Sequence, residues 1–164
     1  MEYEHIVHSF EPVYDKDSEI LILGTLPSVK SRENNFYYGH KQNRFWKVLA
    51  TLLKEPVPET IEEKKAMLLA HRIALWDVIQ SCDIKGSSDS SIKNAQPTDI
   101  GMILEKTNVT QIYANGNKAG QLYKRYQFSV TGIEATVLPS TSPANAAWSL
   151  ARLCEAWKTI LHDL

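Results

Sequence analysis

The stretch Ile20–Leu53, ILILGTLPSVKSRENNFYYGHKQNRFWKVLATLL, decides how this chain folds. It opens with four aliphatic residues, Ile20 to Leu23, a run too short for a helix and typical of a buried strand. Gly24 ends that run, and a polar, aromatic loop then leads to a helix that we expect to begin near Asn43. In a parallel sheet, ligands bind at this carboxyl end of the strands, so the loop is the first place to look for function.

Outside this stretch, strand-like and helix-like segments alternate along the chain. After an entry arm over residues 1–19, the pattern predicts strands at 73–78, 111–114 and 136–138, and helices at 60–71, 98–106, 118–126 and 144–161. The polar tract 81–96 is predicted to be a loop. Strands that alternate with helices indicate a mainly parallel sheet covered on both faces. We therefore expect a single domain over residues 1–164 of the α/β class, a three-layer α/β/α sandwich with a short sheet of about four strands.

Two turns rich in proline and serine follow the first and fourth predicted strands, at residues 24–28 and 139–143. Because parallel strands end at the same edge of the sheet, these turns are expected to face each other across one cleft. The only carboxylate expected at a strand end is Asp77, which we interpret as a brace for its loop. There is no nucleophile elbow and no Walker loop. The cleft therefore offers amides, hydroxyls and aromatic rings, which suit a planar polar heterocycle.

Charge is nearly balanced over the whole chain, with a formal net charge of -1, so it gives no global sign of a nucleic-acid partner. Basic residues are nevertheless concentrated between residues 30 and 47, against the single acid Glu33: Lys30, Arg32, Lys41, Arg44 and Lys47. Such a local patch can bind phosphates on a neutral protein, or it can be an ordinary solvated face.

The two cysteines, Cys82 and Cys154, lack the spacing of a zinc or iron–sulfur site. We expect reduced thiols, no metal and no cofactor. The N-terminus has no apolar signal core, and no segment is long and apolar enough to span a membrane. These features predict a soluble, cytoplasmic protein, which we expect to be a monomer with no membrane partner.

Three motifs together resemble the uracil-DNA glycosylase superfamily: GTLPSVKS at 24–31, YYGHKQNRFW at 37–46 and LPSTSPANA at 138–146. They are most similar to the branch of hypoxanthine-DNA glycosylases, relatives of the mismatch-specific uracil and thymine enzymes, and the resemblance covers essentially the whole chain. It implies excision of a deaminated base from DNA, hypoxanthine first and uracil second, by hydrolysis of the N-glycosidic bond. The implied partner is double-stranded DNA that contains a damaged base, or single-stranded DNA.

One departure from the relatives concerns the catalytic residue. Leu26 stands where the mismatch-specific branch has the asparagine that positions the attacking water, and leucine cannot orient a water. In the hypoxanthine branch the important asparagine lies in the second part of the loop, and Asn43 is the matching residue. Cleavage through an oxocarbenium-like state needs a donor for the departing base anion and does not demand a carboxylate. The resemblance thus implies that Asn43 is catalytic, whereas its position alone predicts a helix cap.

The resemblance also implies roles for other residues. The base pocket is expected to comprise Gly24, Thr25, Leu26, Pro27, Tyr38, His40, Phe45 and Asn115, with Tyr38 or Phe45 stacking on the base. The DNA-binding residues are expected to be Ser28, Lys30, Lys41, Arg44, Ser140, Ser142, Pro143 and Asn145. Structural roles remain open for several of them, since Phe45 can be a core residue, His40 a plain loop residue, and Asn115 and the serines turn or cap groups. Two other functions also remain open: a DNA-binding relative without catalysis, and a hydrolase of small nucleosides or nucleotides.

Overall fold

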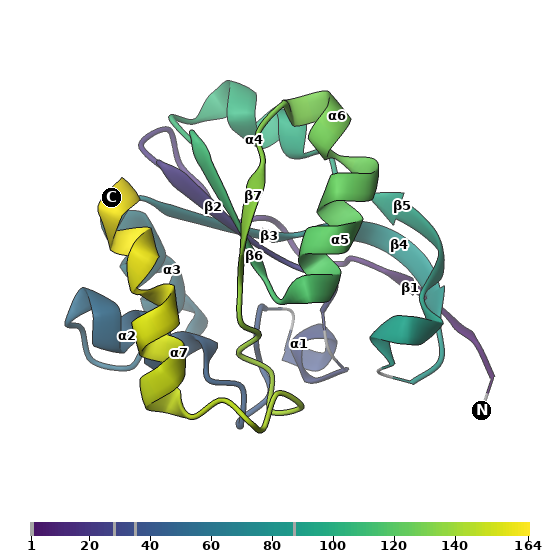
Figure 1. The fold of residues 1–164 in the computed structure, drawn as a ribbon, viewed down its shortest axis with the longest axis horizontal. Helices are drawn as coiled ribbons and strands as arrows, with labels where there is room; N and C mark the ends of the chain where they lie inside the picture. The colour runs from purple at the N-terminus through teal and green to yellow at the C-terminus, as the bar shows by residue number, and fades with distance from the viewer. Residues whose placement is uncertain (1, 28, 35, 87) are drawn as a thin grey trace.

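The computed structural model describes residues 2–27, 29–34, 36–86 and 88–164. Its centre is a four-stranded sheet in the order β3-β2-β6-β7, in which all neighbouring strands run parallel. The strands are β2 (Ile20–Gly24), β3 (Ile73–Asp77), β6 (Gln111–Asn115) and β7 (Ala135–Leu138). Every residue of β2 is buried, because β3 and β6 cover its edges and helices cover its faces (Figure 1). The uninterrupted apolar run that predicted this strand therefore reflects its central place in the sheet.

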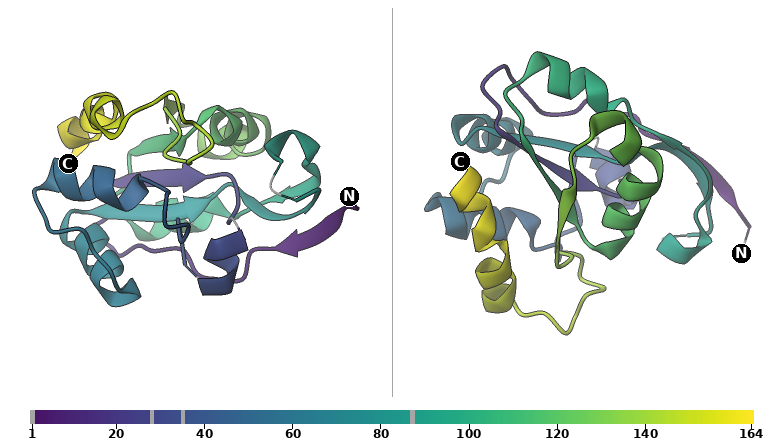
Figure 2. Two further views of the ribbon diagram at one scale, coloured as in Figure 1. Left: turned by 90° about the horizontal axis from the view of Figure 1, so that it is seen from below. Right: turned by 45° about the horizontal axis from the view of Figure 1, so that its top comes forward.

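Helices lie on both sides of this sheet. They are α1 (Val29–Asn34), α2 (Phe45–Leu53), α3 (Ile61–Ala70), α4 (Ile100–Lys106), α5 (Asn117–Tyr126), α6 (Phe128–Thr131) and α7 (Leu150–Trp157), with short 3₁₀ turns at η1 (Asp89–Ser91) and η2 (Lys158–Asp163). Figure 2 shows the sheet nearly edge-on, with α5 and α7 over one face and α1 and α3 beyond the other. The predicted three-layer α/β/α architecture is confirmed.

A second sheet was missing from the sequence prediction. The strands β1 (Glu4–Val7), β4 (Ile79–Ile84) and β5 (Lys93–Pro97) form an antiparallel sheet in the order β1-β4-β5. The predicted loop at 81–96 is therefore wrong at both of its ends, where residues 81–84 and 93–96 are strands. In β4 only Ile79, Cys82 and Ile84 are buried, so its apolar signal is weak. Its partner β1 also lies more than seventy residues away along the chain, since His5 pairs with Asp83, and no local pattern reveals such a pairing.

Helix starts differ from prediction where side chains have other partners. The predicted capping box is present, because the Thr60 hydroxyl accepts the Glu63 amide proton at 3.0 Å. Thr98 does not cap α4: Asp99 does so, while the buried Thr98 hydroxyl donates to the Asp77 carbonyl at 2.7 Å. The last helix begins at Leu150 and not near residue 144, with Ser149 as its cap.

The carboxyl ends of the parallel strands meet at one edge of the sheet. In the register of the strands, Gly24 lies opposite Asp77, and Asn115 lies opposite Leu138. The last residues of all four parallel strands are buried, so each strand delivers a fixed residue to the same place. No helix within the described residues is long and apolar enough to cross a membrane.

Candidate active site

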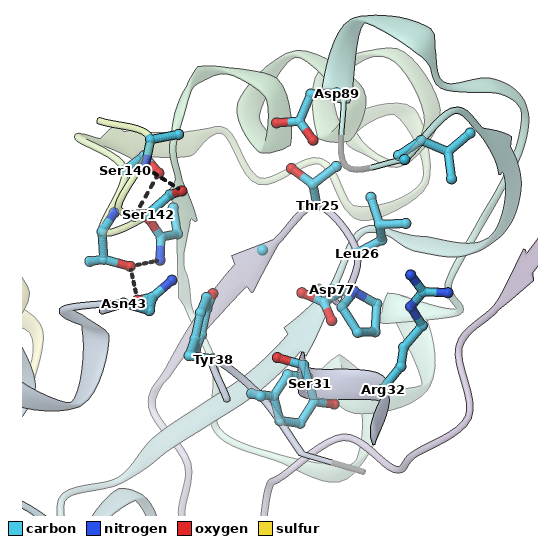
Figure 3. Close-up of a pocket in the computed structure, with 18 residues that line it drawn as sticks. Thr25, Leu26, Ser31, Arg32, Tyr38, Asn43, Asp77, Asp89, Ser140 and Ser142 are labelled. Atoms are coloured by element: carbon cyan, nitrogen blue, oxygen red, sulfur yellow. Dashed lines mark hydrogen bonds between the residues drawn. The ribbon is translucent and has the colours of Figure 1, made fainter. Parts of the chain in front are cut away.

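A cavity of about 390 Å³ lies at this edge of the sheet (Figure 3). Thr25, Leu26 and Pro27 line one side, and Ser140 and Ser142 line another. The two turns that follow β2 and β7 therefore do face each other across one cleft. Its volume falls within the range typical of small-ligand sites.

The floor of the cavity lies over Gly24, where two side chains come close to the backbone. A Cβ atom at Gly24 would lie 2.4 Å from Asp77 Oδ1 and 2.9 Å from the Tyr38 hydroxyl oxygen. Both distances are too short for non-bonded atoms, so only glycine fits unless these side chains move. The glycine is needed here to let a carboxylate and a phenol approach the end of β2.

Tyr38 has an unusual backbone conformation that places its ring at the cavity. Its φ is +53°, a left-handed value that is uncommon for a residue with a side chain. The ring stacks on Phe45 with centroids 4.0 Å apart, and the hydroxyl is buried beside Asp77 and Asn115. Burial raises the pKa of Tyr38 well above its usual range, and the negative charge of Asp77 raises it further, whereas the nearby Asn115 amide lowers it. Among the described residues this buried hydroxyl makes no hydrogen bond of normal geometry, so it is a polar group without a partner next to the cavity.

Asn43 is held with a defined orientation of its amide. Its Oδ1 accepts the Phe45 backbone proton at 2.9 Å, at the start of α2, and the Thr141 hydroxyl proton at 2.8 Å. Both partners must donate, so the acceptor is the oxygen and the orientation of the amide is fixed. Nδ2 has no partner among the described residues, and Asn43 lines the cavity. The carboxamide therefore presents two N–H donors to the cavity.

A second asparagine fixes the direction of this chain of hydrogen bonds. Asn115 Oδ1 accepts the Thr141 backbone proton at 3.1 Å, so its Nδ2 must face the Thr141 hydroxyl, to which it donates at 3.0 Å. Because Thr141 Oγ1 accepts from Asn115, its own proton is directed to Asn43. Asn115 and Thr141 are 8% and 0% exposed, so water does not compete for these groups. The relay Asn115–Thr141–Asn43 thus spans β6, the turn after β7 and the start of α2.

The two interpretations of Asn43 are compatible in this arrangement. Its oxygen stabilises the first turn of α2, as a capping side chain does, although the residue that immediately precedes the helix is Arg44. Its nitrogen remains available to the cavity. The side chain therefore serves the helix through one atom and a ligand through the other.

Arg44 binds the protein's own backbone, a role that the basic stretch did not predict. Its guanidinium donates to the carbonyls of Ser142 at 2.8 Å and Asn145 at 3.1 Å, and to that of Trp148. Its backbone N–H also donates to the Thr141 carbonyl at 3.1 Å. These donors hold the turn after β7 against the start of α2, and such contacts argue against the predicted phosphate-binding role of Arg44.

Two predicted pocket residues do not line the cavity. Phe45 is fully buried, so it cannot stack on a base, and it supports the Tyr38 ring from behind. His40 is exposed outside the cavity, and its Nδ1 accepts the Gln42 backbone proton at 3.1 Å. Both predictions followed from proximity in the sequence, and the turn at Tyr38 separates these residues from the pocket.

The remaining predicted DNA-binding residues lie around the cavity mouth or outside the described part. Ser140 and Ser142 line the cavity, while Asn145 donates through Nδ2 to the Ser140 carbonyl at 2.9 Å. Pro143 is half-buried and Lys41 is exposed. Ser28 and the side chain of Lys30 lie outside the described residues.

Several residues at the cavity were not expected from the sequence as site residues. Thr141 was quoted only as part of a motif, and Asp77 only as a brace. Asp89 lines the wall from η1, and Arg32, expected only as part of the basic stretch, lines it from α1. The one sequence signal for Thr141 is its place between two serines in the second turn, and burial at a strand end is a signal for Asp77.

Comparison with known proteins shows the family of this chain. The profile of the Uracil DNA glycosylase superfamily matches residues 11–164. This chain belongs to the uracil DNA glycosylase superfamily. It is a DNA glycosylase, a hydrolase of N-glycosidic bonds in DNA, as its resemblance to that family implied.

Two similar proteins from Methanosarcina are named for the base hypoxanthine. The chain is 37% identical over 161 residues to the hypoxanthine DNA glycosylase of Methanosarcina acetivorans, an alignment that covers 96% of this chain and 99% of that protein. It is 32% identical over 138 residues to the hypoxanthine DNA glycosylase of Methanosarcina barkeri, covering 83% and 86% of the two chains. The solution NMR structure of a candidate uracil DNA glycosylase from Methanosarcina acetivorans superposes with a TM-score of 0.79, at 37% identity, over 92% of this chain and 93% of that one.

Proposed function

We propose that this glycosylase removes hypoxanthine from DNA, and that the Asn43 amide is its catalytic donor. The names of both Methanosarcina relatives support the choice of base. The observation that supports the role of Asn43 is the fixed amide, whose oxygen is occupied by two donors while its nitrogen is free at the cavity. A donor that is held in place before reaction costs no reorganisation when charge develops on the leaving base.

The base must leave the duplex to reach this cavity. Gly24, Asp77 and Asn115 are buried at its floor, so a base inside a stacked helix cannot contact them. An extruded nucleotide can enter with its base against the Tyr38 ring, which Phe45 holds from behind at 4.0 Å. Stacking of a base on an aromatic side chain stabilises binding by roughly 1–3 kcal/mol.

The DNA backbone is assigned to the turn after β7. Ser140 and Ser142 lie at the cavity, and their hydroxyls hold the turn in shape by accepting backbone protons of Ser142 and Ala144 at 3.1 and 3.2 Å. A hydroxyl that accepts one proton still has its own to donate to a phosphate oxygen. The rigid turn would thus contact the sugar-phosphate chain beside the extruded nucleotide.

Breaking the glycosidic bond moves its electron pair onto the base, water adds to the sugar carbon, and the proton that this water loses neutralises the base anion. In this scheme Asn43 stabilises the departing anion through Nδ2. Thr141 and Asn115 prevent the Asn43 carboxamide from rotating and exchanging its oxygen and nitrogen. One such donor in a water-poor site is worth about 3 kcal/mol, or about a hundredfold in rate.

The test is release of the base from labelled duplexes that contain hypoxanthine, uracil or a thymine mismatch, followed by alkaline cleavage of abasic sites. We expect hypoxanthine to be released fastest, and we expect Asn43→Ala to reduce that single-turnover rate about a hundredfold while binding is retained. Binding of the hypoxanthine duplex without cleavage would instead show a DNA-binding relative that lacks catalysis. Release of uracil alone would overturn the choice of base.

A further inference from the structure

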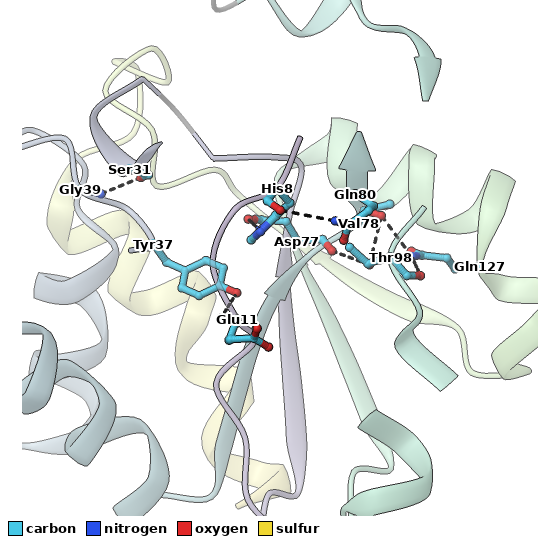
Figure 4. A network of polar contacts seen from close by, with 10 residues as sticks. All are labelled: His8, Glu11, Ser31, Tyr37, Gly39, Asp77, Val78, Gln80, Thr98 and Gln127. Atoms are coloured by element: carbon cyan, nitrogen blue, oxygen red, sulfur yellow. Dashed lines mark hydrogen bonds and ion pairs between the residues drawn. The ribbon is translucent and has the colours of Figure 1, made fainter. Parts of the chain in front are cut away.

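A buried histidine–aspartate pair adjoins the cavity. Asp77 ends β3 and is 3% exposed, and its Oδ2 accepts a hydrogen bond from His8 Nε2 at 2.8 Å (Figure 4). His8 is 7% exposed. Burying a carboxylate is costly unless it is hydrogen-bonded, so a pair at this depth needs an explanation beyond stability.

The N-terminal arm delivers His8 to this position. Its backbone N–H donates to the Gln80 carbonyl at 2.7 Å, which extends the pairing of β1 with β4 by one residue. The imidazole packs against Phe10, with ring centroids 4.6 Å apart, and against Tyr37 at 5.8 Å. His8 lies in the arm that precedes residue 11, where the match to the superfamily profile begins.

The second oxygen of the Asp77 carboxylate lies at the cavity. Oδ1 lies directly above Gly24, at the place where a Cβ would come within 2.4 Å, and Asp77 lines the cavity. Among the described residues, no group donates a hydrogen bond to this oxygen. A carboxylate oxygen only accepts, so the floor of the cavity offers an acceptor and requires a donor from whatever enters.

We propose that Asp77 Oδ1 accepts the ring N–H on the pairing edge of the extruded base, the N1–H of hypoxanthine, and that His8 is the positioning residue that holds the carboxylate for it. This inference rests on the proposed function. Deamination of adenine converts N1 from a lone pair into an N–H, so a fixed acceptor distinguishes the damaged base from its parent. Adenine would place its N1 lone pair against Oδ1, leaving both acceptors unpaired in a buried site. Guanine shares the N1–H, so Asp77 separates hypoxanthine from adenine and not from guanine.

A different role for the same carboxylate makes a different prediction. If Asp77 activated the attacking water, its loss would slow excision of every base equally, because the water is common to all. If it accepts the N1–H, its loss affects only bases that carry that hydrogen. The ratio of rates on two bases therefore separates the roles, and it is insensitive to the fraction of protein that is folded.

The experiment compares single-turnover excision of hypoxanthine and of 1-methylhypoxanthine, in which a methyl group replaces the N1 hydrogen. We expect the wild-type protein to prefer hypoxanthine by on the order of a hundredfold or more, because a buried acceptor rejects a ligand that lacks its donor. Asp77→Ala removes the acceptor and makes room for the methyl group, so this preference should fall about tenfold or more. Asp77→Asn keeps the volume of the side chain and should also reduce the preference, because His8 holds the amide oxygen and directs an N–H at the base.

His8 is tested in the same assay with a matched control. His8→Phe keeps a ring of similar shape but removes the donor to Oδ2, so the preference should fall by roughly three- to tenfold, as for one lost hydrogen bond. His8→Gln can restore a donor and should recover part of the preference. The control is His5→Phe, since His5 forms an exposed pair with Asp83 at 2.8 Å from the same arm and should leave the preference unchanged.

The outcomes separate this inference from the proposed function. An active wild type whose preference is unchanged in both Asp77 variants would overturn the inference alone, as would an equal loss on both bases. A wild-type protein that releases no hypoxanthine would overturn the proposed function and this inference with it.

Discussion

In the segment between β2 and α2, residues 25–44, the Tyr38 hydroxyl and Asn43 Nδ2 meet the cavity without a hydrogen-bond partner among the described residues. In the β7–α7 loop, residues 139–149, the polar side chains bind their own backbone instead: Ser140 accepts from Ser142, and Asn145 donates to Ser140. Both segments are polar and both line the cavity. The first supplies groups that meet the base, and the second is a frame that holds them, through Thr141 and through the carbonyls bound by Arg44, while its serine hydroxyl protons remain for the DNA backbone.

This difference shows that the number of polar residues in a loop is a poor guide to its chemistry. What matters is which atoms remain without partners after folding, because those atoms can bind a ligand without first breaking a bond within the protein. The frame should therefore affect rate indirectly, by allowing Asn43 or the loop to move. Substitutions in the first segment should change the chemistry directly.

Apart from Asn43 itself, the largest effect is expected at Gly24, next to the Tyr38 hydroxyl and the Asp77 carboxylate. In Gly24→Ala the added Cβ would come 2.4 Å from Asp77 Oδ1 and 2.9 Å from the Tyr38 hydroxyl, so both side chains must shift. A displacement of about 1 Å at a reacting site costs about a hundredfold in rate. Single-turnover excision should fall by that amount. Gly101→Ala is the control, since its Cβ would meet only Asp99 Oδ1 at 3.5 Å. A Gly24→Ala protein with full activity would show that this floor does not contact the base.

A smaller effect is expected at Thr141, the link between frame and donor. Thr141→Val keeps the shape of the side chain but removes the hydroxyl that fixes Asn43 and accepts from Asn115. The rate should fall about tenfold, the scale of one lost hydrogen bond. The buried Asn115 amide would lose its acceptor, which should lower the unfolding free energy by roughly 1–3 kcal/mol. Thr141→Ser should restore both rate and melting temperature. A Thr141→Val protein that is destabilised but fully active would show that the relay Asn115–Thr141–Asn43 is not needed for catalysis.

Arg44 should affect stability more than chemistry. Arg44→Met keeps much of the apolar stem but releases the three carbonyls of the β7–α7 loop. We expect the unfolding free energy to fall by about 2 kcal/mol, measured by denaturant unfolding, with a loss of rate below about tenfold. Lys47→Met is the matched control, because Lys47 is exposed one turn later on α2. An Arg44 variant of unchanged stability but weakened DNA binding would restore the phosphate role that the contacts argue against.

The smallest effect is expected at the exposed lysine of the first segment. Lys41→Gln should reduce the slope of log affinity for duplex DNA against log salt by about one, as for a single phosphate contact. Lys106→Gln is the comparison, because α4 lies at the other end of the molecule from the cavity loops in Figure 1. Equal slopes in the wild type, Lys41→Gln and Lys106→Gln would mean that DNA binds on another surface.

The sequence predicted the parallel sheet and the facing turns because those depend on local patterns. The buried run at Ile20–Leu23, the capping box at Thr60 and the two proline-rich turns each have a signal within a few residues. The sheet formed by β1, β4 and β5 has a weak local signal, since only alternate parts of β4 are buried and β1 pairs with it across more than seventy residues. The same holds for His8, which meets Asp77 only because β1 pairs with β4.

Within the site, residue types could be predicted but not their free atoms. The motifs identified Asn43, Tyr38 and Ser140 as neighbours of one cleft. They could not show that the Arg44 guanidinium would donate to backbone carbonyls, because this depends on how the loop after β7 folds back on α2. Nor could they show that Phe45 would lie behind the Tyr38 ring. Hydrogen-bond partners are a property of the folded molecule.

The most direct test of the account is the single-turnover rate of Asn43→Asp on hypoxanthine DNA. Aspartate can accept from Phe45 and Thr141 as asparagine does, so α2 and the melting temperature should be nearly unchanged. It has no Nδ2 donor, however, and it places a negative charge where the base anion leaves. We predict a rate lower than that of the wild type by about a hundredfold or more. A stable Asn43→Asp protein with full activity would contradict the claim that the free amide nitrogen of Asn43 drives catalysis.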